Sequence, residues 1–178
     1  MGEGPLSALL PGPRTVDPAR SPSLVTFGAI TLCLSGGAAG AGGEVVLDAV
    51  RYRTEPTPLV AGAWLRTVPA EAGRTQGNAW DWRPLLEARG FPGRLVGGPW
   101  LGDFSRTVAG ARVIEQCDGA SDLAVRRTEL VTALRVAGTG TVVTTIFVDY
   151  HVGANDFTLM IPGQQRVCGT RVTSGQGC

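Results

Sequence analysis

Hydrophobic and polar side chains alternate most regularly in the last third of the chain. In residues 141–152 (TVVTTIFVDYHV), Ile146 and Val148 fall on one side of the alternation, and Phe147 and Asp149 fall on the other. A period of two is what a pleated strand produces, whereas a helix repeats every 3.6 residues. The many β-branched residues suit a half-buried pleated surface. The pattern therefore predicts a strand over these residues.

Similar runs surround this strand. We predict three more strands in this region, at residues 129–136, 157–161 and 165–172, separated by turns at residues 138–140, 153–156 and 162–163. Gly, Pro, Asn and Asp at the breaks are typical turn residues. Earlier in the chain, the pattern predicts strands at residues 24–34, 44–53, 59–68, 94–100 and 107–117.

Residues 24–34 (LVTFGAITLCL) allow two interpretations. The run follows two arginines and precedes the small residues GGAAGAGG at 36–43, an arrangement that resembles a signal peptide. Thr26 and Thr31 interrupt the run, and alternate positions are apolar on both sides, which favours a buried strand. We therefore expect a strand here, followed by a flexible hairpin loop. The run is too short to span a bilayer as a helix.

One segment has helical spacing instead. In residues 79–90 (AWDWRPLLEARG), Trp82, Leu85 and Leu86 recur at helical intervals, and Gly90 supplies a stop signal. The sequence thus predicts an all-β protein, an immunoglobulin-like two-sheet antiparallel sandwich with one short helical insertion. A small β-barrel is the alternative.

The domain limits follow from composition. Residues 1–23 contain five prolines and no sustained periodicity, which predicts a flexible N-terminal arm. The sandwich is expected over residues 24–172, with a C-terminal tail at 173–178. Sixteen arginines against fifteen acidic residues leave a net charge of +1, with no long run of either sign. Nucleic-acid binding is therefore not expected.

The four cysteines are Cys33, Cys117, Cys168 and Cys178, and none belongs to a CxxC pair. With a single histidine in the chain, a zinc site of normal spacing is not predicted. Widely spaced cysteines near strands fit disulfides formed in an oxidising compartment, although buried free thiols in the cytosol remain the alternative. Four cysteines allow three pairings, and the spacing does not choose among them.

A frame of short motifs (FGAITLCL, GEVVLDAVRYR, EQC, ELVTALRVAGTGTVVTTIFVDYHVG and FTLMIPGQQRVCG) resembles a loose group of secreted or envelope-anchored, uncharacterised immunoglobulin-like sandwiches of high-GC Gram-positive bacteria. The positions that match are Leu32-Cys33, Cys117 and Cys168. The resemblance implies an extracellular or cell-envelope location and brings no known activity. No convincing leader or lipid anchor precedes Phe27, so a cytoplasmic location stays open. Among the pairings we favour Cys117 with Cys168, leaving Cys178 free or intermolecular.

Residues with catalytic or metal-binding chemistry gather near the turn at 153–156. Asp149 and His151 share one strand face and could form an oriented general base, and with Asn155 and Asp156 they could hold a cation. The chain has no GxSxG motif, and turn geometry already explains Asn and Asp at this position. Its glycine-rich tracts lack the context of a phosphate loop. The sequence therefore predicts no catalytic residue, metal or cofactor.

Tryptophan marks the best candidate binding site. Trp80, Asp81, Trp82, Trp100 and Asp103 together offer flat aromatic faces beside carboxylates, a combination that suits sugar rings or a protein partner. Core packing is the competing explanation, above all for Trp64 and Trp82.

Three functional hypotheses follow. The leading one is a non-enzymatic extracytoplasmic module that binds a protein or glycan partner through residues 80–100 and loops. The second is a structural subunit that self-assembles through edge strands or its N-terminal arm. The third is a hydrolase that uses His151.

Overall fold

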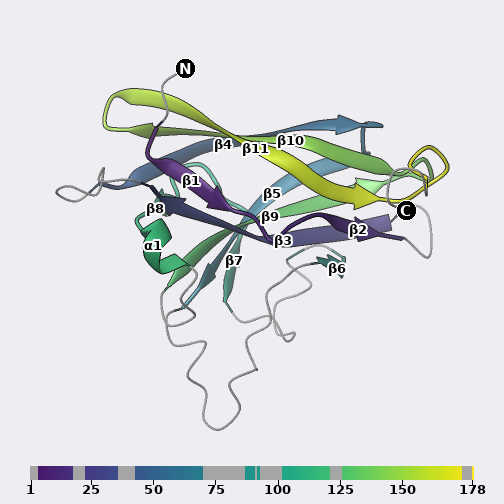
Figure 1. Cartoon of the computed structure of the whole chain (residues 1–178), viewed down its shortest axis with the longest axis horizontal. Helices are drawn as coiled ribbons and strands as arrows, with labels where there is room; N and C mark the ends of the chain where they lie inside the picture. Colours follow the sequence, from purple (N-terminus) through teal and green to yellow (C-terminus); the bar gives the residue numbers. More distant parts are fainter. Residues whose placement is uncertain are drawn as a thin grey trace, which may run out of the picture.

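Two β-sheets packed face to face make up the protein in its computed structural model (Figure 1). The structure describes residues 4–17, 23–35, 43–69, 87–90, 92, 102–120, 126–173 and 178. The six-stranded sheet runs β1 (Leu6–Leu9), β3 (Ser23–Leu34), β9 (Arg127–Val136), β5 (Val60–Val68) and β7 (Asp103–Ser105), with β6 (Glu87–Arg89) paired to β3. The five-stranded sheet runs β2 (Arg14–Val16), β11 (Asn155–Val167), β10 (Thr141–Val152), β4 (Val45–Glu55) and β8 (Arg112–Val113).

This arrangement confirms the predicted two-sheet β-sandwich. The order β3-β9-β5 in one sheet and β11-β10-β4 in the other matches the B-E-D and G-F-C order of immunoglobulin-like domains. The pairs are antiparallel except for β2 with β11, which is parallel. The central strand β10 has the bounds that the alternation predicts.

The core lies between the sheets, and its inward side chains reveal three β-bulges. Along β3 the core contains Phe27 and then Ile30, and along β10 it contains Val143 and then Ile146. In β4 the step is from Leu47 to Val50. Each step is three residues instead of two, because a bulge inserts one extra residue and reverses the facing of everything after it. A strict period of two therefore gives the correct facing over only part of each of these three strands.

The predicted helix over residues 79–90 is not seen in its described part. Residues 87–89 form β6, which pairs with Val25–Phe27 of β3, while residues 79–86 lie outside the described residues. β1 covers β3 only from Thr31 to Leu34, so the rest of that edge is free to accept another strand. Pairing with the edge of β3 therefore outweighs the helical propensity of residues 87–89. The helical turn that the described residues contain is α1 (Cys117–Ala120).

The predicted turn at residues 162–163 is a continuous part of β11 instead. Pro162 lies opposite Thr145 of β10, beside the bulge, and β2 does not extend to it. Bulges and edge strands are where a sheet tolerates proline. A side chain at Gly163 would collide with the carbonyl group of Val143, so glycine permits the close approach of β10 beside its bulge.

The first part of the chain also differs from the prediction. Residues 6–9 and 14–16 of the predicted flexible arm form β1 and β2, which join different sheets. The connection between β3 and β4 is not a hairpin, because these strands also belong to different sheets. Of residues 107–117, only Arg112–Val113 form a strand, and residues 94–100 lie outside the described residues.

Two disulfides join Cys33 to Cys117 and Cys168 to Cys178, so the favoured Cys117–Cys168 pairing is wrong. Cys117 is brought beside Cys33 by the pairing of Leu34 with the segment before α1, including a 2.8 Å bond from the Leu34 N–H to the Glu115 carbonyl oxygen. Cys168 lies by the turn after β9, whereas Cys33 and the Cys117 bonded to it lie by the start of β9. The two ends of β9 therefore separate Cys117 from Cys168. A ten-residue strand is about 33 Å long, far beyond the reach of a disulfide.

Candidate functional site

Most of the predicted tryptophan site cannot be placed. Trp80, Asp81, Trp82 and Trp100 lie outside the described residues, and Asp103 is exposed at the first position of β7. Two described strands belong to this region, because β6 lies between Trp82 and Trp100 and β7 begins at Asp103. β6 pairs with one edge of the six-stranded sheet, and β7 pairs with Leu65–Thr67 of β5 at the opposite edge.

Further contacts fasten these two elements to the sheet. The Thr26 hydroxyl donates a 2.5 Å hydrogen bond to the Gly90 carbonyl oxygen, and the Gly90 N–H bonds to the Leu24 carbonyl oxygen at 2.9 Å. Trp64, Ala88 and Phe104 pack around fully buried Val131 on the outer face. Trp64 is half-buried there, which agrees with the core-packing explanation for this tryptophan.

The same outer face contains a buried ion pair. The Arg66 guanidinium donates to Glu129 Oε2 at 3.1 Å, and the two side chains are 0% and 2% exposed. Burial raises the pKa of Glu129 and lowers that of Arg66, because both charges have lost water, and each partner opposes the shift of the other. Arg66 also lies 5.9 Å from the ring centroid of Phe104 in β7. The pair thus links β5, β9 and β7.

The outer face of the five-stranded sheet is open and polar by comparison. Arg51 of β4 makes a two-pronged ion pair with Asp149 of β10, with both N···O distances at 2.7 Å. The Thr158 hydroxyl donates to the same carboxylate at 2.7 Å. The pKa of Asp149 is lowered chiefly by its hydrogen bond with Arg51, because that bond favours the charged carboxylate.

An aromatic ring continues this network. The guanidinium carbons of Arg51 and Arg53 lie 5.1 and 5.8 Å from the ring centroid of Phe147, within cation–π range. Met160 lies directly opposite Phe147 on β11 and is 58% exposed. The Arg51–Phe147–Arg53 cluster was not predicted from the sequence, because it depends on the register between β4 and β10.

Asp149 and His151, which the sequence allowed as a general-base pair, do not pair with each other. His151 Nδ1 lies 2.9 Å from Asp48 Oδ1 instead, and Asp149 is occupied by Arg51 and Thr158. Within the described part of the chain, no serine hydroxyl hydrogen-bonds to His151, and no three His, Cys, Asp or Glu side chains gather as a metal site would need.

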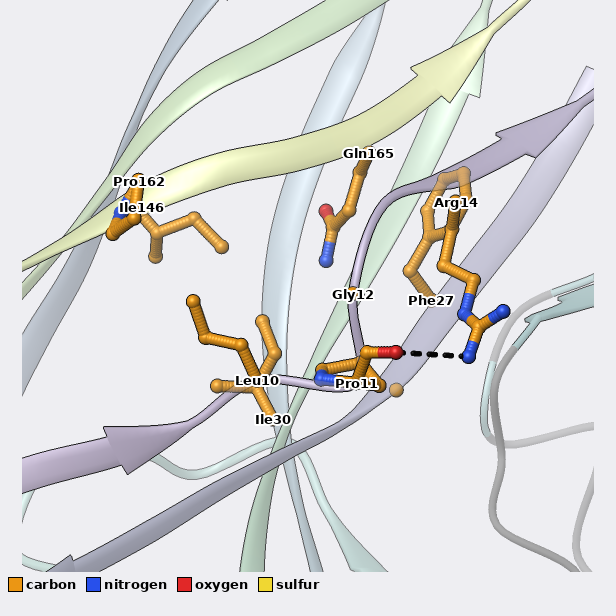
Figure 2. A pocket seen from close by; sticks show the side chains of 10 residues that line it. Leu10, Pro11, Gly12, Arg14, Phe27, Ile30, Ile146, Pro162 and Gln165 are labelled. Atoms are coloured by element: carbon orange, nitrogen blue, oxygen red, sulfur yellow. Dashed lines mark hydrogen bonds between the residues drawn. The ribbon is translucent and has the colours of Figure 1, made fainter.

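A small cavity between the sheets does not offer a substrate site either (Figure 2). It measures about 10 Å³, which is room for about one water molecule. Apolar side chains of β3 and β10 line it together with the segment that joins β1 to β2, and the Gln165 side chain points into it. A shallow groove of about 320 Å³ lies elsewhere, lined by Glu55, Pro56, Val142, Thr144, Arg171 and Val172.

No protein-family model matches the chain, and no curated protein sequence is significantly similar to it. Among the described residues, no helix is both long and apolar enough to cross a membrane.

Proposed function

We propose that the protein is a non-enzymatic binding module that works outside the cytoplasm and holds a protein or glycan partner through residues 80–100 and adjoining loops. The observation that carries the proposal is the anchoring of β6 and β7 at opposite edges of the six-stranded sheet. Four strand spacings separate them, or about 19 Å. β6 lies within residues 80–100 and β7 follows shortly after them, so the tryptophan-rich segment is attached to the sheet at two points. A segment held in this way loses less freedom on binding than a free loop does.

The two disulfides support the extracytoplasmic part of the proposal, because such bonds persist in oxidising compartments and are rare in the cytosol. Aromatic side chains beside carboxylates suit both sugar rings and protein hot spots.

The test compares Trp80→Ala and Trp100→Ala with the unchanged protein on an array of defined glycans and in pull-downs of envelope proteins. We expect retention to fall by about tenfold or more, as for an aromatic anchor. His151→Ala is the matched control, because its half-exposed side chain lies on the other sheet, and it should leave retention unchanged. Equal retention by all the variants would remove the tryptophans from the site.

Self-assembly through edge strands is the second candidate, and the open edges of the five-stranded sheet favour it. β2 covers only residues 165–167 of the long strand β11, and β8 covers only residues 45–46 of β4. The N-terminal arm is less available to a neighbour, because β1 and β2 already pair within the chain. Analytical ultracentrifugation over a wide concentration range tests this candidate, and a monomer throughout would contradict it.

A further inference from the structure

Among the described residues, β8 is the strand that pairs with the edge of β4 facing away from β10. β8 pairs only with Val45 and Val46, and the backbone of Leu47 bonds to the segment just before β8. From residue 49 to residue 55, no strand among the described residues lies along this edge. A stretch of this length matches a typical strand, and an open edge offers unpaired N–H and C=O groups to another chain.

The side chains along this edge have a distinct chemistry on each face. On the outer face, Arg51 and Arg53 lie over Phe147 of β10, and exposed Met160 of β11 lies opposite that ring on the side away from β4. Arg51 already pairs with Asp149, whereas Arg53 makes no ion pair with any described carboxylate. Arginine, methionine and aromatic rings are the side chains most enriched at protein interfaces.

The inner face of the same edge is apolar. Val50 and Tyr52 pack against the core and are only partly buried, and no strand in the described part of the chain lies beside them. Burial of the Tyr52 hydroxyl raises its pKa. A strand added here would set alternate side chains beside Val50 and Tyr52, and the remaining side chains beside Arg51 and Arg53.

We propose that residues 49–55 of β4 bind an extended, acidic segment of a partner protein, which adds to the five-stranded sheet as a further strand. Main-chain hydrogen bonds would supply affinity, and carboxylates at alternate positions would pair with the arginines. A second copy of β4 paired antiparallel about Tyr52 fits less well, because Arg51 of each copy would face Arg53 of the other. This surface belongs to the five-stranded sheet, whereas β6 and β7 belong to the six-stranded sheet, and the inference does not depend on the function proposed for residues 80–100.

The test uses the full, oxidised, isotope-labelled protein and a synthetic peptide of about seven residues that alternates valine with aspartate. NMR titration at up to millimolar peptide should show amide shift changes and slower hydrogen exchange confined to residues 49–55 and their neighbours in β10. Arg53→Glu should weaken binding by about tenfold or more, because one attractive pair becomes repulsive. The same variant should gain affinity for a peptide that alternates valine with lysine.

Two controls make the result decisive. Arg166→Glu reverses a charge on β11, two strands away from the open edge, and should leave the affinity unchanged. The aspartate peptide with a methylated backbone should not bind, because it cannot form the ladder. Equal binding of the aspartate and lysine peptides, binding of the methylated peptide, shifts centred on residues 155–161, or no binding at all would each overturn the proposal.

Discussion

The outer faces of the two sheets carry similar ion pairs in opposite surroundings. On the six-stranded sheet, Arg66 and Glu129 are almost completely buried. On the five-stranded sheet, Arg51 is 59% exposed and Asp149 is 25% exposed, although their contact is shorter and two-pronged. The contact geometry alone would rank the exposed pair as the stronger one.

Burial reverses that ranking for the stability lost when one partner is removed, so the loss is larger at the Arg66–Glu129 pair. A charge left alone in a buried site keeps its full desolvation cost, whereas an exposed charge is rehydrated by water and screened by salt. The comparison teaches that the six-stranded sheet depends on its outer face for stability. On the five-stranded sheet the exposed Arg51–Asp149 pair contributes little, so substitutions at this pair should cost less stability.

The largest expected effect tests the buried pair. Glu129→Ala should lower the free energy of unfolding by about 3–5 kcal/mol, because Arg66 would lose its buried carboxylate partner. Asp149→Ala should cost less than about 1 kcal/mol. Urea unfolding measures both values. If the two variants were equally destabilised, the contrast between the faces would be wrong. The double variant Arg66→Met with Glu129→Leu should recover most of the stability that Glu129→Ala loses, because it removes both buried charges.

The disulfides extend the comparison with a smaller expected difference. Cys33 and Cys117 are 84 residues apart, whereas Cys168 and Cys178 are 10 apart. Loop-closure entropy predicts a loss of about 4–5 kcal/mol when the first bridge is replaced by alanines and about 3 kcal/mol for the second. Thermal and urea unfolding of the two double variants provide the measurement. A larger loss for the short loop would show that local packing at the C-terminus outweighs chain entropy.

The smallest effect is a pH dependence on the open face. Because Arg51 lowers the pKa of Asp149, the pair stabilises the folded state above the unfolded-state pKa of about 3.9. That contribution, under about 1 kcal/mol, disappears as the pH falls through the lowered pKa of the folded state. The free energies of unfolding of the protein and of Asp149→Asn should therefore differ at about pH 5 to 6 and converge as the pH falls below about 4. A constant difference at every pH would exclude this titration as the cause.

Strand positions could be predicted from the sequence far better than side-chain facing. The alternation in residues 141–152 gives the bounds of β10 correctly, because β-branched residues in period two have few alternatives to a strand. The facing reverses near Thr144, since a bulge depends on where Gly163 lets the neighbouring strand approach. Such a contact joins residues distant in sequence, and no local pattern records it.

The partners of Asp149 and His151 illustrate the same limit. Residues two apart on a strand share a face, but their Cα atoms are about 6.6–6.8 Å apart, whereas side chains opposite each other on neighbouring strands lie closer. Asp149 therefore pairs with Arg51, and His151 pairs with Asp48. Both partners come from β4 and depend on its register. Arg66 and Glu129 could have been noticed as charged residues within apolar runs, which marks them as candidates for a buried pair.

The parallel contact between β2 and β11 has a mechanical consequence. These strands lie near the two ends of the chain, and their register joins Arg14 to Gln165 and Val16 to Val167. Tension between the termini would pull the two strands in opposite directions along their common axis, so the hydrogen bonds of the ladder would bear the load together rather than open one after another. A short ladder in this shear geometry resists stretching more than its few bonds would in an unzipping geometry.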